Sequence, residues 1–138
     1  MWIYVQRTGD FFQNSTYIET GYSGKLPEGK NDPAKECVRD IGPIPRGYYT
    51  INAAVNSPTV VSLPLVPDTP NYCQPPRSGF LIHGDNSTGT ASTGCIILTR
   101  STRERVTGSN DKRLRVVADS VRSERVSGKR YAEKLELK

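Results

Sequence analysis

The chain has 138 residues, a formal net charge of +5 and a pI of about 9.2. This length is typical of one domain and suffices to bury a core without disulfides or metals. Hydrophobic residues make up 35%, beside 12 glycines and 10 prolines, which favours short strands and many turns over a helical bundle. No apolar run reaches the ~18 residues of a transmembrane helix, so the sequence predicts no membrane span.

Positive charge gathers in the last third of the chain, from Arg100 to Lys138. A basic surface attracts anions such as nucleic acid, phospholipid headgroups and the carboxylates of cell-wall polymers. Tyr131 is the only aromatic residue in this stretch, so the stacking platform typical of nucleic-acid binding modules is missing. We therefore expect no nucleic acid as a partner, and we expect residues 118–138 to form a charged tail.

The first third of the chain predicts strands joined by tight turns. Residues 2–5 are rich in strand formers, and residues 11–18 predict a hairpin that turns near Asn14. The glycines of residues 21–24 are expected to end this hairpin. An Asp-Pro pair, typical of a helix N-cap followed by a first-turn proline, predicts one helical turn over residues 33–37.

The middle of the chain continues the strand pattern. Residues 48–51 form a clear strand after a rigid Gly-Pro turn, and β formers recur over residues 59–66. Proline cannot donate to a sheet ladder. We therefore expect Pro64 and Pro67 at sheet edges or in loops.

The last third predicts strands on either side of one short helix. Residues 80–83 and 94–98 are short apolar strands. Ser101, followed three residues later by a glutamate, matches the capping-box pattern and predicts a helix that Gly108 ends. Residues 114–117 form a last strand.

Two reactive side chains flank a polar loop between the apolar strands. His83, the only histidine of the chain, ends one strand, and Cys95 begins the next. Adjacent strands joined this way would bring both side chains to the same rim of a sheet. A free thiol has a pKa near ~8.5, so an imidazole that takes its proton makes it a nucleophile at neutral pH. The pattern predicts Cys95 as nucleophile and His83 as base, against the alternative of a core thiol and a structural histidine.

The residues beside Cys95 suit acyl-transfer chemistry. Gly94 allows a sharp backbone turn, and the N–H of Cys95 with that of Gly94 or Thr93 would form an oxyanion hole. One histidine and three dispersed cysteines have no zinc-type spacing, so we predict neither a metal nor a cofactor. Cys37 and Cys73 form a disulfide or remain two reduced thiols, which the sequence leaves open.

The segments around this pair resemble the signature of YkuD-like L,D-transpeptidases, a His, a variable stretch and then Ser-His-Gly-Cys. Residues 82–84 and 92–96 match it, with Thr93 in place of the second histidine and a shorter stretch between. Both departures resemble the type VI secretion L,D-transpeptidase effectors, whose likeness runs through residues 2–117 in several ordered motifs. We accordingly expect a catalytic domain over residues 1–117.

This resemblance implies a mostly β fold, a YkuD-like L,D-transpeptidase sandwich or barrel with one or two short helices. Ser92 would shape the turn at the nucleophile, and a backbone carbonyl would orient the imidazole. Asp85, next to Gly84, is a candidate for further support, although a loop-capping aspartate is an equal alternative. Arg100 and Arg103 are candidates for binding a stem-peptide carboxylate, since arginine suits bidentate carboxylate recognition; ordinary solvated charge is the alternative.

The implied substrate is a peptidoglycan tetrapeptide stem. Attack on the diaminopimelate carbonyl releases D-Ala, and the acyl group passes to water, to a D-amino acid or to another stem. Residues 1–7 lack the pattern of a Sec signal peptide, so we expect synthesis in the cytoplasm and delivery by type VI secretion components into the periplasm of target bacteria. A cognate immunity protein is the expected partner in the producer.

Three other functions fit parts of the sequence. One is a different Cys/His peptidoglycan hydrolase, an endopeptidase or amidase. Another is a non-catalytic cell-wall binding module with the same fold. The third is a binder of anionic polymers that acts through the basic tail.

Overall fold

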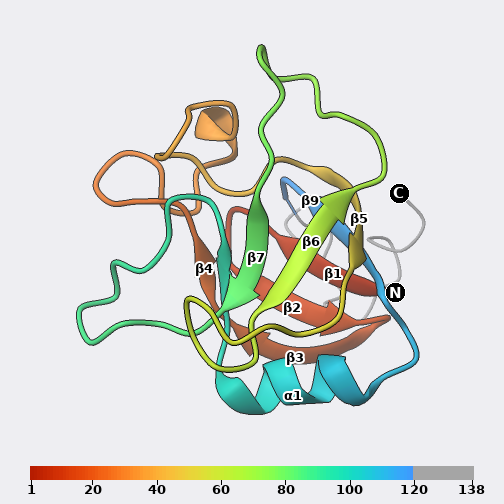
Figure 1. Ribbon diagram of the computed structural model, residues 1–138. Coiled ribbons are helices and arrows are strands. Elements are labelled where there is room, and N and C mark those ends of the chain that lie inside the picture. The colour runs from red at the N-terminus through yellow and green to blue at the C-terminus, as the bar shows by residue number, and fades with distance from the viewer. Residues whose placement is uncertain (120–138) are drawn as a thin grey trace, which may run out of the picture.

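The computed structural model describes residues 1–119, which build one nine-stranded sheet in the order β3-β2-β1-β9-β5-β6-β7-β8-β4 (Figure 1). The strands are β1 (Trp2–Val5), β2 (Asp10–Gln13), β3 (Thr16–Thr20), β4 (Tyr22–Ser23), β5 (Gly47–Ile51), β6 (Leu63–Pro67), β7 (Phe80–His83), β8 (Ile96–Ile97) and β9 (Arg113–Val117). The edge strands β3 and β4 follow one another in the chain, so the sheet curls into a nearly closed barrel. The predicted mostly β fold is confirmed.

The core fills the inside of this sheet with large side chains from nearly every strand. Trp2 and Phe11 stack with ring centroids 5.4 Å apart, and Tyr49 meets Phe80 edge-on at 6.3 Å. Helix α1 (Arg100–Gly108) packs against β7 across the lower end of the sheet in Figure 1 and buries Val106 in the core. Each fully buried apolar side chain contributes about 1.5–3 kcal/mol.

Two pairings of the sheet are parallel, β1 with β9 and β7 with β8. In the second pair Ile82 lies opposite Ile96, and His83 lies opposite Ile97. The predicted strands that carry the reactive pair are therefore neighbours. Because they run the same way, their connection (residues 84–95) has to return along the sheet, and it projects as a long loop in Figure 1.

Helix α1 begins differently from the capping-box prediction. Its N-cap is Thr99, and Ser101 lies inside the first turn. The Thr99 side chain accepts no cap bond, but its hydroxyl donates to Glu19 of β3 at 2.8 Å and its N–H donates to the same carboxylate at 3.0 Å. A tertiary contact thus replaces the local motif.

The middle strands also differ from expectation. The strand β6 starts at Leu63, and Pro64 and Pro67 lie within it, although it is an inner strand. The Pro64 carbonyl accepts from the N–H of Asn52, just beyond the end of β5. The missing N–H of Pro64 therefore falls at the last rung of that ladder, where it interrupts little pairing.

Two segments above the sheet form the surroundings of the site. The predicted helical turn is a 3-10 turn, η1 (Pro33–Lys35), and the Asp32 side chain caps it by accepting from Ala34 N at 3.0 Å. A disulfide between Cys37 and Cys73 joins this segment to the loop that precedes β7.

No helix within residues 1–119 has the length and apolarity to cross a bilayer. Most of the predicted tail, residues 120–138, lies outside the described residues.

Candidate active site

Strands β7 and β8 place Cys95 and His83 on one face of the sheet. Cys95 directly precedes β8, and its Sγ accepts from the N–H of Leu81 at 3.3 Å. Side chains alternate along a strand, so Leu81, His83 and Cys95 point away from the face that buries Ile82 and Ile96.

The sequence had predicted His83 and Cys95 at the same rim of the sheet, but they lie toward opposite ends of the two paired strands. His83 lies at the end of β7 and Cys95 at the start of β8, one strand across and two residues along. In a sheet such diagonal neighbours lie about 7–8 Å apart, with their Cβ atoms somewhat closer. Within residues 1–119 no hydrogen bond joins the thiol to the imidazole, so each is held by its own backbone partner.

The imidazole of His83 is buried, with 6% of the residue exposed, and one ring nitrogen is engaged. Its Nδ1 lies 2.8 Å from the carbonyl oxygen of Gly84. A carbonyl only accepts, so this bond requires the proton on Nδ1. In the neutral ring Nε2 is then the unprotonated, basic nitrogen.

The thiol of Cys95 is partly buried and is the one free cysteine of the chain. Burial raises its pKa above the ordinary value, while the Leu81 N–H and the positive charge of Arg77 act in the opposite direction. The thiol is therefore mostly protonated at neutral pH and needs a base before it attacks.

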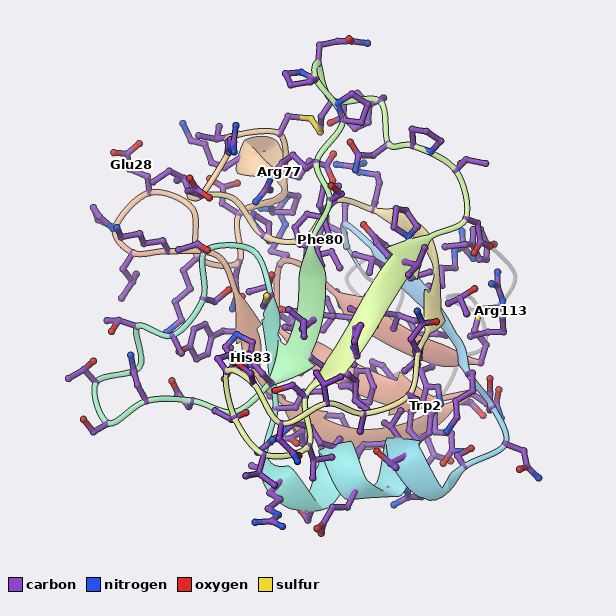
Figure 2. The ribbon with its side chains drawn as sticks, in the orientation of Figure 1. Trp2, Glu28, Arg77, Phe80, His83 and Arg113 are labelled. Carbon is purple, nitrogen blue, oxygen red and sulfur yellow. A yellow bond between two sulfur atoms is a disulfide. The ribbon has the colours of Figure 1, made fainter. Side chains whose placement is uncertain are left out.

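Arg77 is a site residue that sequence reasoning missed. Its buried guanidinium lies over the Phe80 ring at 5.2 Å, and Figure 2 shows both at the end of β7 opposite His83. The same group donates to the carbonyls of Glu36 at 2.6 Å and Thr93 at 3.1 Å. Desolvation lowers its pKa, but an arginine stays charged. No local pattern marks Arg77, since its partners come from segments distant in the sequence.

The turn before the nucleophile is held by Ser92. Its hydroxyl donates to the Cys95 carbonyl at 2.6 Å and accepts from the N–H groups of Gly94 at 3.1 Å and Gly24 at 2.9 Å. The bond to Ser92 engages the Gly94 N–H, so the predicted use of that N–H in an oxyanion hole is not favoured. The N–H groups of Thr93 and Cys95 are the remaining candidates.

A cleft of about 470 Å³ opens beside Cys95. Its volume is within the ~300–1,000 Å³ of small-molecule sites. Its walls come from the 3-10 segment, the loop before β7 and the nucleophile turn, and they include Cys37, Arg39, Asp40, Arg77 and Cys95. The cleft therefore presents charges of both signs next to the thiol.

A comparison with protein-family models matches residues 18–121, well over half of the chain, to the Tlde1 domain. The chain belongs to the Tlde1 domain family. This is the domain of type VI LD-transpeptidase effector 1, so the chain is assigned to type VI secretion effectors with an LD-transpeptidase-type activity on peptidoglycan. Neither the curated proteins nor the solved structures that were searched contain a match. The matched residues of the chain begin within β3 and include His83 and Cys95.

Asp85 of this Tlde1 domain supports the loop after β7. Its carboxylate accepts from the Tyr22 hydroxyl at 2.5 Å and from the N–H of Asn86 at 2.8 Å. Burial and the bond to Asp85 raise the pKa of Tyr22 to about 12. The imidazole of His83 is bonded to the Gly84 carbonyl, so the arrangement favours the loop-capping alternative for Asp85.

The two arginines predicted to bind a substrate carboxylate lie on α1, away from the walls of the Cys95 cleft. Arg100 is exposed and forms an ion pair with Glu104 at 3.2 Å, and it borders a second cleft of about 420 Å³. Arg103 borders the same second cleft but is only 6% exposed, and its Nε and Nη1 donate to the Leu98 and Val60 carbonyls. These contacts favour a structural use of its charge, and its predicted role in binding a stem-peptide carboxylate stays a prediction. Within residues 1–119 no group of His, Cys, Asp and Glu is arranged to hold a metal ion.

Proposed function

We propose that Cys95 attacks the carbonyl of the L-centre of diaminopimelate in a tetrapeptide stem, with His83 as the base. One observation carries this proposal. The single free thiol borders a cleft of substrate size, on the same sheet face as a histidine whose Nδ1–H is engaged and whose Nε2 is basic. Membership of the Tlde1 domain family supports the choice of peptidoglycan.

The first half-reaction forms a thioester and releases D-Ala. His83 Nε2 takes the proton of the thiol, and the thiolate adds to the carbonyl carbon. The N–H groups of Cys95 and Thr93 face the developing oxyanion, and the nearby Arg77 charge favours both anionic states. The C–N bond to D-Ala then breaks, and the amine leaves with the proton that His83 held.

The second half-reaction decides the product. Water attacks the thioester, loses a proton to His83 and leaves a tripeptide stem with a free carboxylate, which is L,D-carboxypeptidase activity. The amine of a free D-amino acid reacts in the same way and forms a new peptide bond. In both cases the thiol regains its proton from His83, so the enzyme returns to its starting state.

The disulfide of the cleft wall supports action outside the cytoplasm. Disulfides persist in the bacterial periplasm and are rare in the reducing cytosol. The Cys37–Cys73 bond joins two walls of the cleft that contains the thiol. We therefore propose that type VI secretion components deliver the protein to the periplasm of target bacteria, where stem peptides are its substrate and a cognate immunity protein protects the producer.

The test uses purified tetrapeptide muropeptides with and without an added D-amino acid, and reads the products by mass. The wild-type protein should remove D-Ala or replace it with the added amino acid. Cys95→Ala should do neither, while Cys37→Ala/Cys73→Ala, which keeps the nucleophile, should retain measurable activity. Cleavage elsewhere in the stem would identify an endopeptidase or amidase instead. No reaction with folded protein would leave a non-catalytic wall-binding module.

A further inference from the structure

A buried cation, Arg103, lies near the candidate base and is not part of the walls of the Cys95 cleft. Arg103 of α1 donates through Nε to the Leu98 carbonyl at 3.1 Å. Its Nη1 donates to the carbonyls of Val60 at 2.6 Å and Val61 at 2.9 Å, and approaches Thr59 Oγ1 at 3.3 Å. A planar guanidinium with several backbone acceptors holds them in one fixed arrangement.

The contacts of Arg103 continue to the imidazole through Thr59. The Thr59 hydroxyl oxygen accepts from the N–H of Gly84 at 2.8 Å, and the Gly84 carbonyl accepts from His83 Nδ1. A Cβ on Gly84 would lie 2.9 Å from Arg103 Nη2, so the backbone here approaches the guanidinium as closely as glycine allows. Gly84, whose carbonyl sets the histidine tautomer, is thus held at its N–H by Thr59, which Arg103 contacts in turn.

Leu98 connects the same arginine to both strands of the reactive pair. Its N–H donates to the His83 carbonyl at 3.2 Å, and its carbonyl accepts from Arg103 Nε. Leu98 follows β8, which Cys95 precedes. Arg103 therefore holds the ends of β7 and β8 together, and their register determines how His83 lies relative to Cys95.

Backbone strain is present at this position. Val61 has a φ of +62°, a left-handed conformation that a β-branched residue rarely adopts. Its carbonyl is one of the acceptors of Arg103. The strained residue is thus held by Arg103, in the same segment as the Thr59 hydroxyl that binds Gly84.

We propose that Arg103 and Thr59, which we call the Arg103–Thr59 bridge, are positioning residues. They fix the backbone of Gly84, so that its carbonyl keeps the proton of His83 on Nδ1 and leaves Nε2 as the base. The inference rests on the proposed function of His83. It assigns Arg103 a role in positioning the imidazole instead of in substrate binding. Neither residue touches the reacting atoms, so their effect is on the orientation and protonation of the ring.

The first test observes the ring directly and needs no substrate. His83 is the only histidine, so ¹⁵N-histidine labelling gives an unambiguous ring spectrum that reports which nitrogen carries the proton at pH 8.5. The wild type and Thr59→Ser should show the Nδ1–H form, because both keep the hydroxyl. Thr59→Val, which has nearly the same shape without the hydroxyl, should show a mixture of both forms. An Nε2–H form in the wild type, or identical spectra in the two variants, would overturn the proposal.

The second test measures turnover and thiol reactivity. Thr59→Val and Arg103→Lys should lower kcat by about tenfold or more with KM within about twofold, since a misplaced base slows proton transfer and leaves the cleft intact. Thr59→Ser, which keeps the hydroxyl, should retain activity close to that of the wild type. Arg105→Lys, an exposed position on α1, should match the wild type. Unchanged kcat in Thr59→Val would count against the bridge. If no form turns over stem peptides, the proposed function fails, and the ring spectrum still decides on the bridge.

Discussion

At the scale of single residues, the site depends on backbone geometry next to the nucleophile. Gly94 has a φ of +146°, and a Cβ there would lie 2.6 Å from Arg77 Nη2 and 3.0 Å from the Phe80 ring. The turn thus needs glycine for two reasons, its conformation and the close approach of the cation. Ser92 and Arg77 then fix the carbonyl and N–H groups around Cys95.

Gly94→Ala should abolish most activity, and should lower stability by about 1–3 kcal/mol through strain and the clash with Arg77. Gly89→Ala is the matched control, since Gly89 also has a positive φ of +70° but open space around its Cβ position. Thermal unfolding and muropeptide turnover measure both effects. Equal losses in the two variants would show that the close contact with Arg77 is irrelevant.

The charge of Arg77 should be visible in the titration of Cys95. Burial raises the pKa of this thiol and Arg77 lowers it, so Arg77→Met should raise the pKa further and shift the onset of thiolate reactivity to higher pH. The rate of iodoacetamide labelling between pH 6 and 11 gives the midpoint, because the other two cysteines are in a disulfide. Arg39→Met, an exposed charge on the same cleft, should shift it much less. A midpoint that stays in place in folded Arg77→Met would refute the electrostatic role.

At the scale of elements, a buried carboxylate joins the 3-10 segment to the sheet. Glu36 is 1% exposed and accepts from the Tyr72 hydroxyl at 2.5 Å, the Gln6 amide at 2.9 Å and the N–H of Arg46 at 2.9 Å. Its carbonyl also accepts from Arg77. The same residue thus stabilises the cleft wall and anchors the cation beside the thiol.

Stability should fall in acid because of Glu36. Burial alone raises its pKa, but the bonds from Tyr72, Arg46 and Gln6 outweigh burial and lower the pKa below the ordinary value. A lowered pKa in the folded state gives stability that is complete above the unfolded value of ~4.3 and is lost as the pH falls through the folded value. Glu36→Gln should cost about 2–3 kcal/mol at pH 7. Denaturant unfolding at pH 7 and pH 3 should show a smaller difference between variant and wild type at pH 3, and an unchanged difference would contradict this account.

At the scale of the whole molecule, the sheet depends on its first two strands. The strand β1 lies between β2 and β9, and its four residues are fully buried, yet both strands precede the residues matched to the Tlde1 domain. A chain that begins at residue 16 would lack β1 and would leave the edge of β9 that pairs with β1 without a partner strand. The matched segment alone is therefore not expected to be a folding unit.

Deletion of residues 1–15 should leave a chain without a cooperative thermal transition. Deletion of residues 120–138 should keep both the fold and the activity, because the sequence predicts that these residues are a charged tail outside the catalytic domain. Circular dichroism during heating and muropeptide turnover test the two deletions side by side. A cooperative transition in the first deletion would show that β1 is dispensable. Loss of activity in the second would assign the tail a part in catalysis or substrate binding.

The sequence by itself predicted most of the strands, the turn at Asn14 and the resemblance that the family match supports, and it singled out His83 and Cys95 as the candidate pair. These features rest on local chemistry, such as side-chain alternation, glycine and proline geometry and short motifs. Only the tertiary structure decided the parallel pairing of β7 with β8, the disulfide, the place of Arg77 and the inward direction of Arg103. Each depends on contacts between segments far apart in the chain, where the burial of a charge or the register of a strand is set by packing and no nearby residue records it.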